Sequence, residues 1–145
     1  MINPIGIITA ITTFLTIWFG HVMVRKLESR MERIAPAVII CILLGFGFGI
    51  YAVLVESNTV SAIFGIVGFT FLWDALEFYR QEKRIKVGHA PANPNNPRHA
   101  DILAQYSSAT TVDLLNREPR GKAYSAEEIT NILQTKSEIK GYEYS

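Results

Sequence analysis

The sequence predicts an all-α integral membrane protein, with a three-helix transmembrane bundle followed by a proline-rich linker and short cytoplasmic helices. Two observations lead to this fold class. Apolar residues occupy 49 of the first 79 positions but only 22 of the remaining 66. The first 24 residues carry no charge, and from Ile34 to Trp73 the only charged side chain is Glu56. A helix in a water-soluble core needs no such uniform apolarity, so we expect lipid around the first half of the chain.

The first predicted span covers residues 5–24. At 1.5 Å per residue this segment forms a helix of about 30 Å, which matches the hydrocarbon thickness of a bilayer. The apolar run is longer than that of a secretory signal, and it lacks a basic leader and a small-residue cleavage pattern. We therefore interpret it as a retained span.

Two further spans are predicted at residues 34–55 and 59–79. Pro36 falls in the first turn of the second span, where a missing N–H costs little. The third span has a shorter uncharged part, so Asp74 and Glu77 must lie in its last turns, at or near the lipid headgroups.

The basic residues predict the orientation. They follow the first and third spans, whereas the N-terminal tip and residues 56–59 have none: Arg25, Lys26, Arg30, Arg33, Arg80, Lys83, Arg84 and Lys86. By the positive-inside rule the N-terminus is outside and the C-terminus is cytoplasmic. The expected location is the bacterial cytoplasmic (inner) membrane, crossed three times.

Small and hydroxyl residues are the candidates for helix packing. In lipid the hydrophobic effect does not drive helices together, so close backbone contact and shared hydrogen bonds must do so. They lie on one face of each span: Gly45 and Gly49 on the second, Ser61 and Gly65 on the third, and Thr9, Thr12, Thr13 and Thr16 on the first. Packing within one chain is the favoured interpretation. A homodimer through Gly45 and Gly49, or a threonine-lined solute path, are the alternatives.

The rest of the chain is predicted to divide into a linker and a tail. The three-span domain covers residues 1–88, and Pro91, Pro94 and Pro97 then alternate with asparagines in a linker over residues 89–97. This composition is typical of an extended spacer, with a ligand for an SH3-type domain as the alternative. Residues 98–145 follow as a cytoplasmic helical tail.

The tail has short apolar stripes at helical spacing. The residues expected to dock on a partner are Ile102, Leu103, Tyr106, Leu114, Leu115, Ile129, Ile132 and Leu133, with Val112 beside the second group. Ser125 and Glu128 fit a capping box at the start of the last helix, and Gly141 can end it. So short a segment rarely builds its own core, so we expect partial disorder, or docking on a partner or on the membrane domain.

One polar cluster is predicted near the cytoplasmic interface, where His21 and the two acidic residues Asp74 and Glu77 lie at similar depth. Such a group can relay protons or bind a cation. The structural alternative places all three in the headgroup layer, each paired with a basic neighbour: Arg25, Lys26 or Arg80.

Several functional classes are excluded by the sequence. A net charge of +1 leaves no cationic surface for nucleic acid, and the single cysteine, Cys41, forms neither an intramolecular disulfide nor a thiolate zinc cluster. His89 and His99 fall beyond the spans, so a membrane haem with two histidine ligands is not expected. No catalytic, metal-binding or cofactor-binding motif is found, and we expect none of these sites.

A family resemblance rests on the end of the third span and the residues after it. This part of the chain is similar to the ending of the small bacterial membrane proteins grouped as domain of unknown function 4491. The residues that carry the similarity are the run 68–73, Glu77, the stretch 81–84, Gly88, Pro91, Asn93 and Pro94. The resemblance covers Met1 to Arg98 and implies a three-span unit with a histidine, here His21, at the end of the first span. In the family a proline usually follows this histidine, whereas here the next residue is Val22. The resemblance implies no activity, ligand or functional residue.

Two functions follow as hypotheses. The first is a non-enzymatic accessory or anchoring subunit of a larger membrane complex, whose tail docks on a protein partner. The second is an oligomeric small channel or transporter component that uses the polar residues of the first and third spans.

Overall fold

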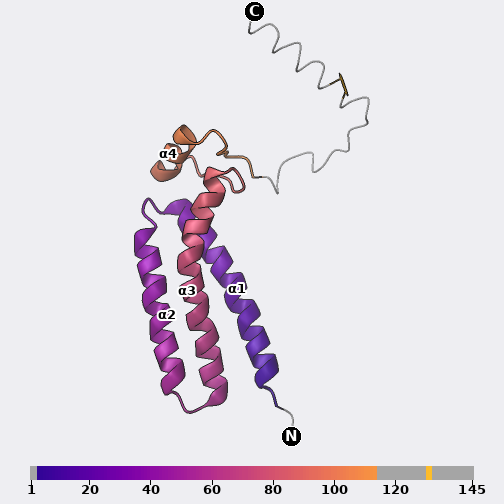
Figure 1. Cartoon of the computed structure of the whole chain (residues 1–145), viewed down its shortest axis with the longest axis vertical. Coiled ribbons are helices and arrows are strands. Elements are labelled where there is room, and N and C mark those ends of the chain that lie inside the picture. The colour runs from indigo at the N-terminus through magenta and orange to yellow at the C-terminus, as the bar shows by residue number, and fades with distance from the viewer. Residues whose placement is uncertain (1–2, 114–129, 132–145) are drawn as a thin grey trace, which may run out of the picture. The chain divides into compact units, whose positions relative to one another are not determined.

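The computed structural model describes residues 3–113 and 130–131. All regular secondary structure in them is α-helical, in the order α1 (Ile5–Arg30), α2 (Ala35–Leu54), α3 (Asn58–Lys86) and α4 (Pro97–Gln105) (Figure 1). The chain divides into two compact units, Met1–Leu114 and Leu115–Ser145, and these four helices belong to the first.

The three long helices, α1, α2 and α3, are each long and apolar enough to cross a membrane. The predicted all-α fold class with three membrane-compatible helices is therefore confirmed, and the chain is a multi-pass membrane protein. Two helices run past the predicted spans: α1 continues from residue 24 to Arg30, and α3 from residue 79 to Lys86. Both extensions are rich in Arg, Lys, Leu, Glu and Gln, which are strong helix formers and lack the proline that would end a helix.

Helix α3 is the centre of the bundle, because it packs along both α1 and α2. Figure 1 shows the three helices side by side, joined by short connections. Close approach of α2 to α3 depends on Gly45 and Gly68: a Cβ atom added to Gly68 would lie 2.9 Å from the carbonyl oxygen of Gly45. Near the other end of this helix pair, Ser61 Oγ donates a hydrogen bond of 2.7 Å to the carbonyl oxygen of Ala52.

The remaining packing candidates occupy different environments. A Cβ added to Gly65 would make an ordinary 3.9 Å contact with Ala52, whereas one added to Gly49 would meet no atom within 4 Å. The four threonines of α1 donate hydrogen bonds mainly to carbonyl oxygens of their own helix: Thr9, Thr12, Thr13 and Thr16. Thr16 also accepts a 3.4 Å hydrogen bond from Thr70 Oγ1, which joins α1 to α3.

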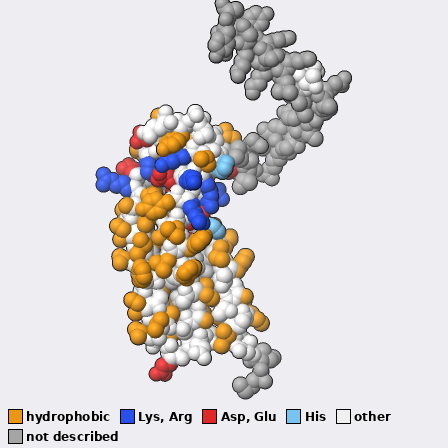
Figure 2. All heavy atoms as spheres, viewed as in Figure 1, with side chains coloured by type: hydrophobic (Ala, Val, Ile, Leu, Met, Phe, Trp, Pro, Cys, Tyr) orange, Lys and Arg blue, Asp and Glu red, His pale blue; other side chains and the backbone are white. Residues whose placement is uncertain are grey.

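Apolar side chains cover the outside of the bundle. On the face shown in Figure 2, hydrophobic side chains spread over the long helices, while most of the charged side chains gather at one end. Val53, Phe69 and Phe14 are exposed by 85%, 71% and 69%, respectively. Exposure of large apolar side chains on this scale fits a lipid environment, where it carries no cost.

The predicted extended spacer over residues 89–97 is wrong, because this segment is folded against the bundle. Ala90 and Ala92 are buried in one apolar cluster with Ile85 of α3 and Ile102 of α4. The chain turns sharply at Gly88, whose φ of +77° is a conformation that glycine adopts without strain. The structure thus joins the linker and the start of the tail to the three-span domain.

Only part of the predicted tail falls within the described residues. Helix α4 contains Ile102 and Leu103 and is followed by Tyr106 as its C-cap, so the first predicted tail helix is present. Val112 is not helical. Of the other predicted docking residues, those that lie outside the described residues are Leu114, Leu115, Ile129, Ile132 and Leu133.

Candidate functional site

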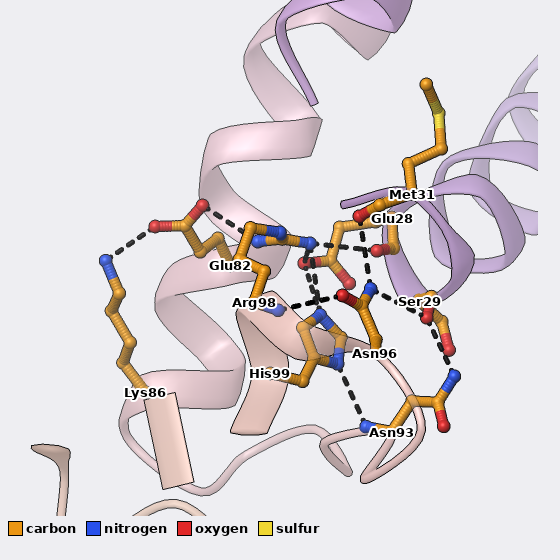
Figure 3. Close-up of polar contacts among 9 residues, drawn as sticks. All are labelled: Glu28, Ser29, Met31, Glu82, Lys86, Asn93, Asn96, Arg98 and His99. Carbon is orange, nitrogen blue, oxygen red and sulfur yellow. Dashed lines mark hydrogen bonds and ion pairs between the residues drawn. The ribbon is translucent and has the colours of Figure 1, made fainter. Parts of the chain in front are cut away.

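Charged and amide side chains meet at the end of the bundle where α1 ends, α2 begins and α3 ends. We call this the basic end, and residues 89–113, which lie over it, the C-terminal cap. Arg98 of α4 connects the cap to two long helices (Figure 3). Its Nη2 lies 2.6 Å from Glu28 Oε1 and 2.8 Å from the Glu28 carbonyl oxygen, and its Nη1 lies 3.0 Å from Glu82 Oε2. One guanidinium therefore links α4 to both α1 and α3.

His99 is fully buried beside Arg98. Its Nδ1 accepts a 2.9 Å hydrogen bond from the backbone N–H of Asn93, and its Nε2 lies 3.1 Å from Glu28 Oε1. The Glu28 side chain is itself only 1% exposed. A buried carboxylate is stable only when it is paired, and here Arg98 and His99 both face the same oxygen atom.

Two asparagines of the cap bind the end of α1 (Figure 3). Asn93 Nδ2 donates a 2.9 Å hydrogen bond to the carbonyl oxygen of Ser29, and Asn96 Nδ2 donates to the carbonyl oxygens of Ser29 and Met31, each over 3.1 Å. The last carbonyl groups of a helix have no partner within it, so these side chains satisfy acceptors that would otherwise need water. Asn96 Oδ1 also accepts from the Arg98 N–H and so caps the start of α4.

This arrangement is suited to fixing the cap in place. Each of its buried charges is paired, and the guanidinium of Arg98 is held between two carboxylates. Only two buried side-chain atoms in this network lack a hydrogen bond, Glu28 Oε2 and Arg98 Nε. We therefore interpret the network as a structural lock between the cap and the long helices.

The structure separates the predicted polar cluster into two parts. Glu77 is 3% exposed and forms ion pairs with Arg84 at 2.6 Å and with Arg80 at 3.8 Å. Asp74, one turn deeper in the bundle, is 4% exposed and forms neither a hydrogen bond nor an ion pair with another described residue. His21 is exposed on α1. Only His21 and Asp74 line the same cavity.

That cavity lies between α1 and α3 and has a volume of about 660 Å³. Its polar lining consists of Thr13, His21, Thr70 and Asp74, and its apolar lining consists of Ile17, Ile66, Phe69 and Trp73 with Gly65. A second cavity of about 390 Å³ between the same two helices also includes Asp74, together with Thr16 and Trp18. Asp74 is thus the acidic side chain that both cavities share.

Six residues of the lock were not predicted as site residues from the sequence: Glu28, Glu82, Asn93, Asn96, Arg98 and His99. Two signals were available. Asn96 followed by Pro97 is the pattern of a helix N-cap and first position, which would have placed the start of α4. Gly20, Val24 and Glu28 recur every four residues, so they share one face of α1, and all three are buried.

Within residues 3–113 and 130–131, no group of three or more His, Cys, Asp or Glu side chains is arranged to hold a metal ion. Cys41, whose thiol is free, is buried in the apolar core between the helices.

Comparison with known proteins finds a family that this chain matches. The family model described as Domain of unknown function (DUF4491) matches residues 3–96, which include all three long helices and the part of the cap that contains Asn93 and Asn96. No curated protein matches, and no solved structure does.

Proposed function

We propose that this chain, which belongs to the DUF4491 family, is a non-enzymatic anchoring subunit of a larger membrane complex. In this proposal the three-helix domain holds the protein in the bilayer. The C-terminal cap then carries the remainder of the chain, residues 114–145, as the segment that docks on a protein partner.

The observation that supports this proposal most is the lock between the cap and the long helices. Arg98 pairs with Glu28 on α1 and Glu82 on α3, and the cap is also joined to α1 by Asn93 and Asn96. Such a connection holds the start of the segment after residue 113 at a fixed place relative to the membrane domain. A flexible spacer would leave that segment free to move relative to the membrane domain.

The sequence of the following segment supports the docking role. Ile129, Ile132 and Leu133 recur at helical spacing, which places an apolar stripe on one face of a helix. A partner helix or groove would cover the stripe. The basic residues at the end of the bundle favour a cytoplasmic position for the cap, in the inner membrane of a bacterium.

The experiment is a comparison of full-length protein with a chain that ends at Asp113, which keeps the cap and its lock. Both are purified in mild detergent after cross-linking in cells, and co-purified proteins are quantified by mass spectrometry. We expect one partner at a fixed ratio with the full-length chain and its loss with the shortened chain. Replacement of Ile129, Ile132 and Leu133 by Asp should have the same effect, and Lys136→Gln serves as the control.

A full-length protein that purifies alone after cross-linking, with no protein at a fixed ratio, would contradict the anchoring role. So would a partner that stays bound when residues 114–145 are removed. The second result would transfer the docking site to the membrane domain or the cap.

A channel or transporter component is the second candidate, favoured by the cavity between α1 and α3 and its acidic side chain, Asp74. Because three helices enclose little space, such a protein would have to form an oligomer. Cation flux into proteoliposomes should then fall strongly in Asp74→Asn and remain unchanged in Glu56→Gln. Absence of flux above that of protein-free vesicles would eliminate this candidate.

A further inference from the structure

Asp74 has an unusual position for a carboxylate in a membrane helix. It is 96% buried, yet neither of its oxygen atoms is bonded to a donor or paired with a cation among the described residues. Neither His21, which lines the same cavity, nor Glu77 is bonded to it. By contrast, Glu77 has Arg84 at 2.6 Å, and Glu28 has Arg98 at 2.6 Å. Of these three buried carboxylates, Asp74 is the one without an ion pair.

Asp74 lies toward the basic end of the membrane-spanning part of α3, where an unpaired carboxylate is still costly. At 1.5 Å per residue, Asp74 lies about 24 Å along α3 from Asn58, and the hydrocarbon layer is about 30 Å thick. Ionisable groups at such depth are rare, and those present usually face a partner, an ion or a ligand.

The chain makes room for this carboxylate. Gly20 of α1 faces it so closely that an added Cβ would lie 2.5 Å from Asp74 Oδ2. A larger residue at position 20 would collide with the side chain. The absence of a side chain at Gly20 thus lets the carboxylate lie directly against α1 at the edge of the cavity.

We propose that the cavity between α1 and α3 binds a lipid-soluble amine, with its protonated nitrogen on Asp74 and its hydrocarbon part along the apolar wall. Charge selects the ligand. A protonated amine supplies both the hydrogen-bond donor and the positive charge that the unpaired Asp74 carboxylate needs, whereas this carboxylate repels an anion. The cavity volume of about 660 Å³ is within the usual range for small-molecule sites.

The rim of the cavity favours entry from the bilayer. Phe69, Ile17 and Trp73 line it and are exposed by 71%, 47% and 44%. These side chains face lipid rather than water, so a ligand dissolved in the membrane reaches Asp74 without crossing the basic end. The hydroxyls of Thr13 and Thr70 lie along the same path and can accept a second hydrogen bond.

The experiment uses full-length protein in lipid nanodiscs and a photoreactive alkyl amine that carries a diazirine in its chain. The matched probe is the alcohol with the same chain and diazirine. Mass spectrometry then identifies the labelled residues. We expect saturable labelling by the amine at Ile66, Phe69 or Ile17, competed by dodecylamine and not by dodecanol. In Asp74→Asn the amine concentration for half-maximal labelling should rise at least tenfold, while in Glu56→Gln, which removes an exposed carboxylate in the turn between α2 and α3, it should stay unchanged.

Three results would overturn the proposal. Equal labelling by amine and alcohol would show a general apolar groove, and labelling of the amine outside the cavity would show a different site. Unchanged amine labelling in Asp74→Asn would remove the role of the charge. The comparison of amine with alcohol in the unmodified protein needs no variant, so the proposal stays testable even if Asp74→Asn folds poorly.

Discussion

The backbone N–H of Asn93 donates to Nδ1 of His99 over 2.9 Å, and this contact fixes the chemistry of the buried ring. A nitrogen that accepts a hydrogen bond carries no proton, so the proton of the neutral ring must be on Nε2. Nε2 lies 3.1 Å from Glu28 Oε1 and donates to it. The 3.1 Å contact of Nε2 with Arg98 is then a proximity of two donors rather than a hydrogen bond. His99 thus acts as a neutral bridge between the cap and α1.

Replacement of His99 tests this bridge. His99→Leu leaves the Asn93 N–H buried without an acceptor, which should cost about 1 to 3 kcal/mol of unfolding free energy. His99→Asn can place its carbonyl oxygen near the position of Nδ1 and should retain part of that stability. Thermal unfolding in detergent ranks the three proteins, and hydrogen exchange reports on the Asn93 amide. Equal protection of that amide in all three would show that the bridge does not form.

Arg98 should be more sensitive than His99, because its removal leaves Glu28 as a buried charge. We expect Arg98→Met to destabilise the protein by about 3 to 5 kcal/mol, as removal of one partner of a buried ion pair does. The double variant with Glu28→Gln removes the orphaned charge and should recover much of the loss. Unfolding of both variants in detergent gives the comparison. A double variant no more stable than Arg98→Met alone would argue against a buried pair.

Gly88 holds the turn from α3 into the cap. In Gly88→Ala the new Cβ would collide with the carbonyl oxygen of Ser108, and the residue would keep a φ of +77°. We expect a loss of about 1 to 3 kcal/mol from the backbone conformation alone, with early proteolysis of the cap as the readout. Cleavage at the unmodified rate would mean that the cap tolerates a different path at residue 88.

Gly68 and Gly47 form a matched pair inside the membrane domain. Alanine at Gly68 would press on the backbone of α2, with its Cβ 2.9 Å from the Gly45 carbonyl oxygen, whereas alanine at Gly47 meets no atom within 4 Å. Gly68→Ala should therefore lower the stability of the bundle in detergent, and Gly47→Ala should leave it unchanged or raise it slightly, since alanine favours a helix. Equal effects of the two changes would indicate that α2 and α3 are not in close contact at Gly68.

The sequence was sufficient to predict the membrane domain, because its evidence is local. An apolar run of bilayer length forms a helix in lipid, because a helix satisfies the hydrogen bonds of its own backbone N–H and C=O groups. The helix bounds were less accurate. The first span was predicted to end at residue 24, although α1 continues through Glu28 to Arg30.

The cap and its lock were missed because their partners are distant in sequence. Asn96 and Met31 are 65 positions apart, and Arg98 and Glu28 are 70 apart, so no local pattern connects them. Proline and asparagine in alternation are typical of a spacer, yet here the asparagines bind the last carbonyl groups of α1. A pattern of composition cannot show which backbone groups elsewhere in the chain lack partners.

The orientation of the three spans underlies the proposed function and can be measured with single cysteines in a Cys41→Ala background. Ser57→Cys lies in the turn between α2 and α3, and Asn95→Cys lies in the cap; both positions are exposed. A membrane-impermeant maleimide is added to spheroplasts before and after permeabilisation. We predict that Ser57→Cys reacts in intact spheroplasts and that Asn95→Cys reacts only once the membrane is opened. Reaction of both cysteines from the same side, or of Asn95→Cys alone in intact spheroplasts, would contradict a three-span anchor with a cytoplasmic cap.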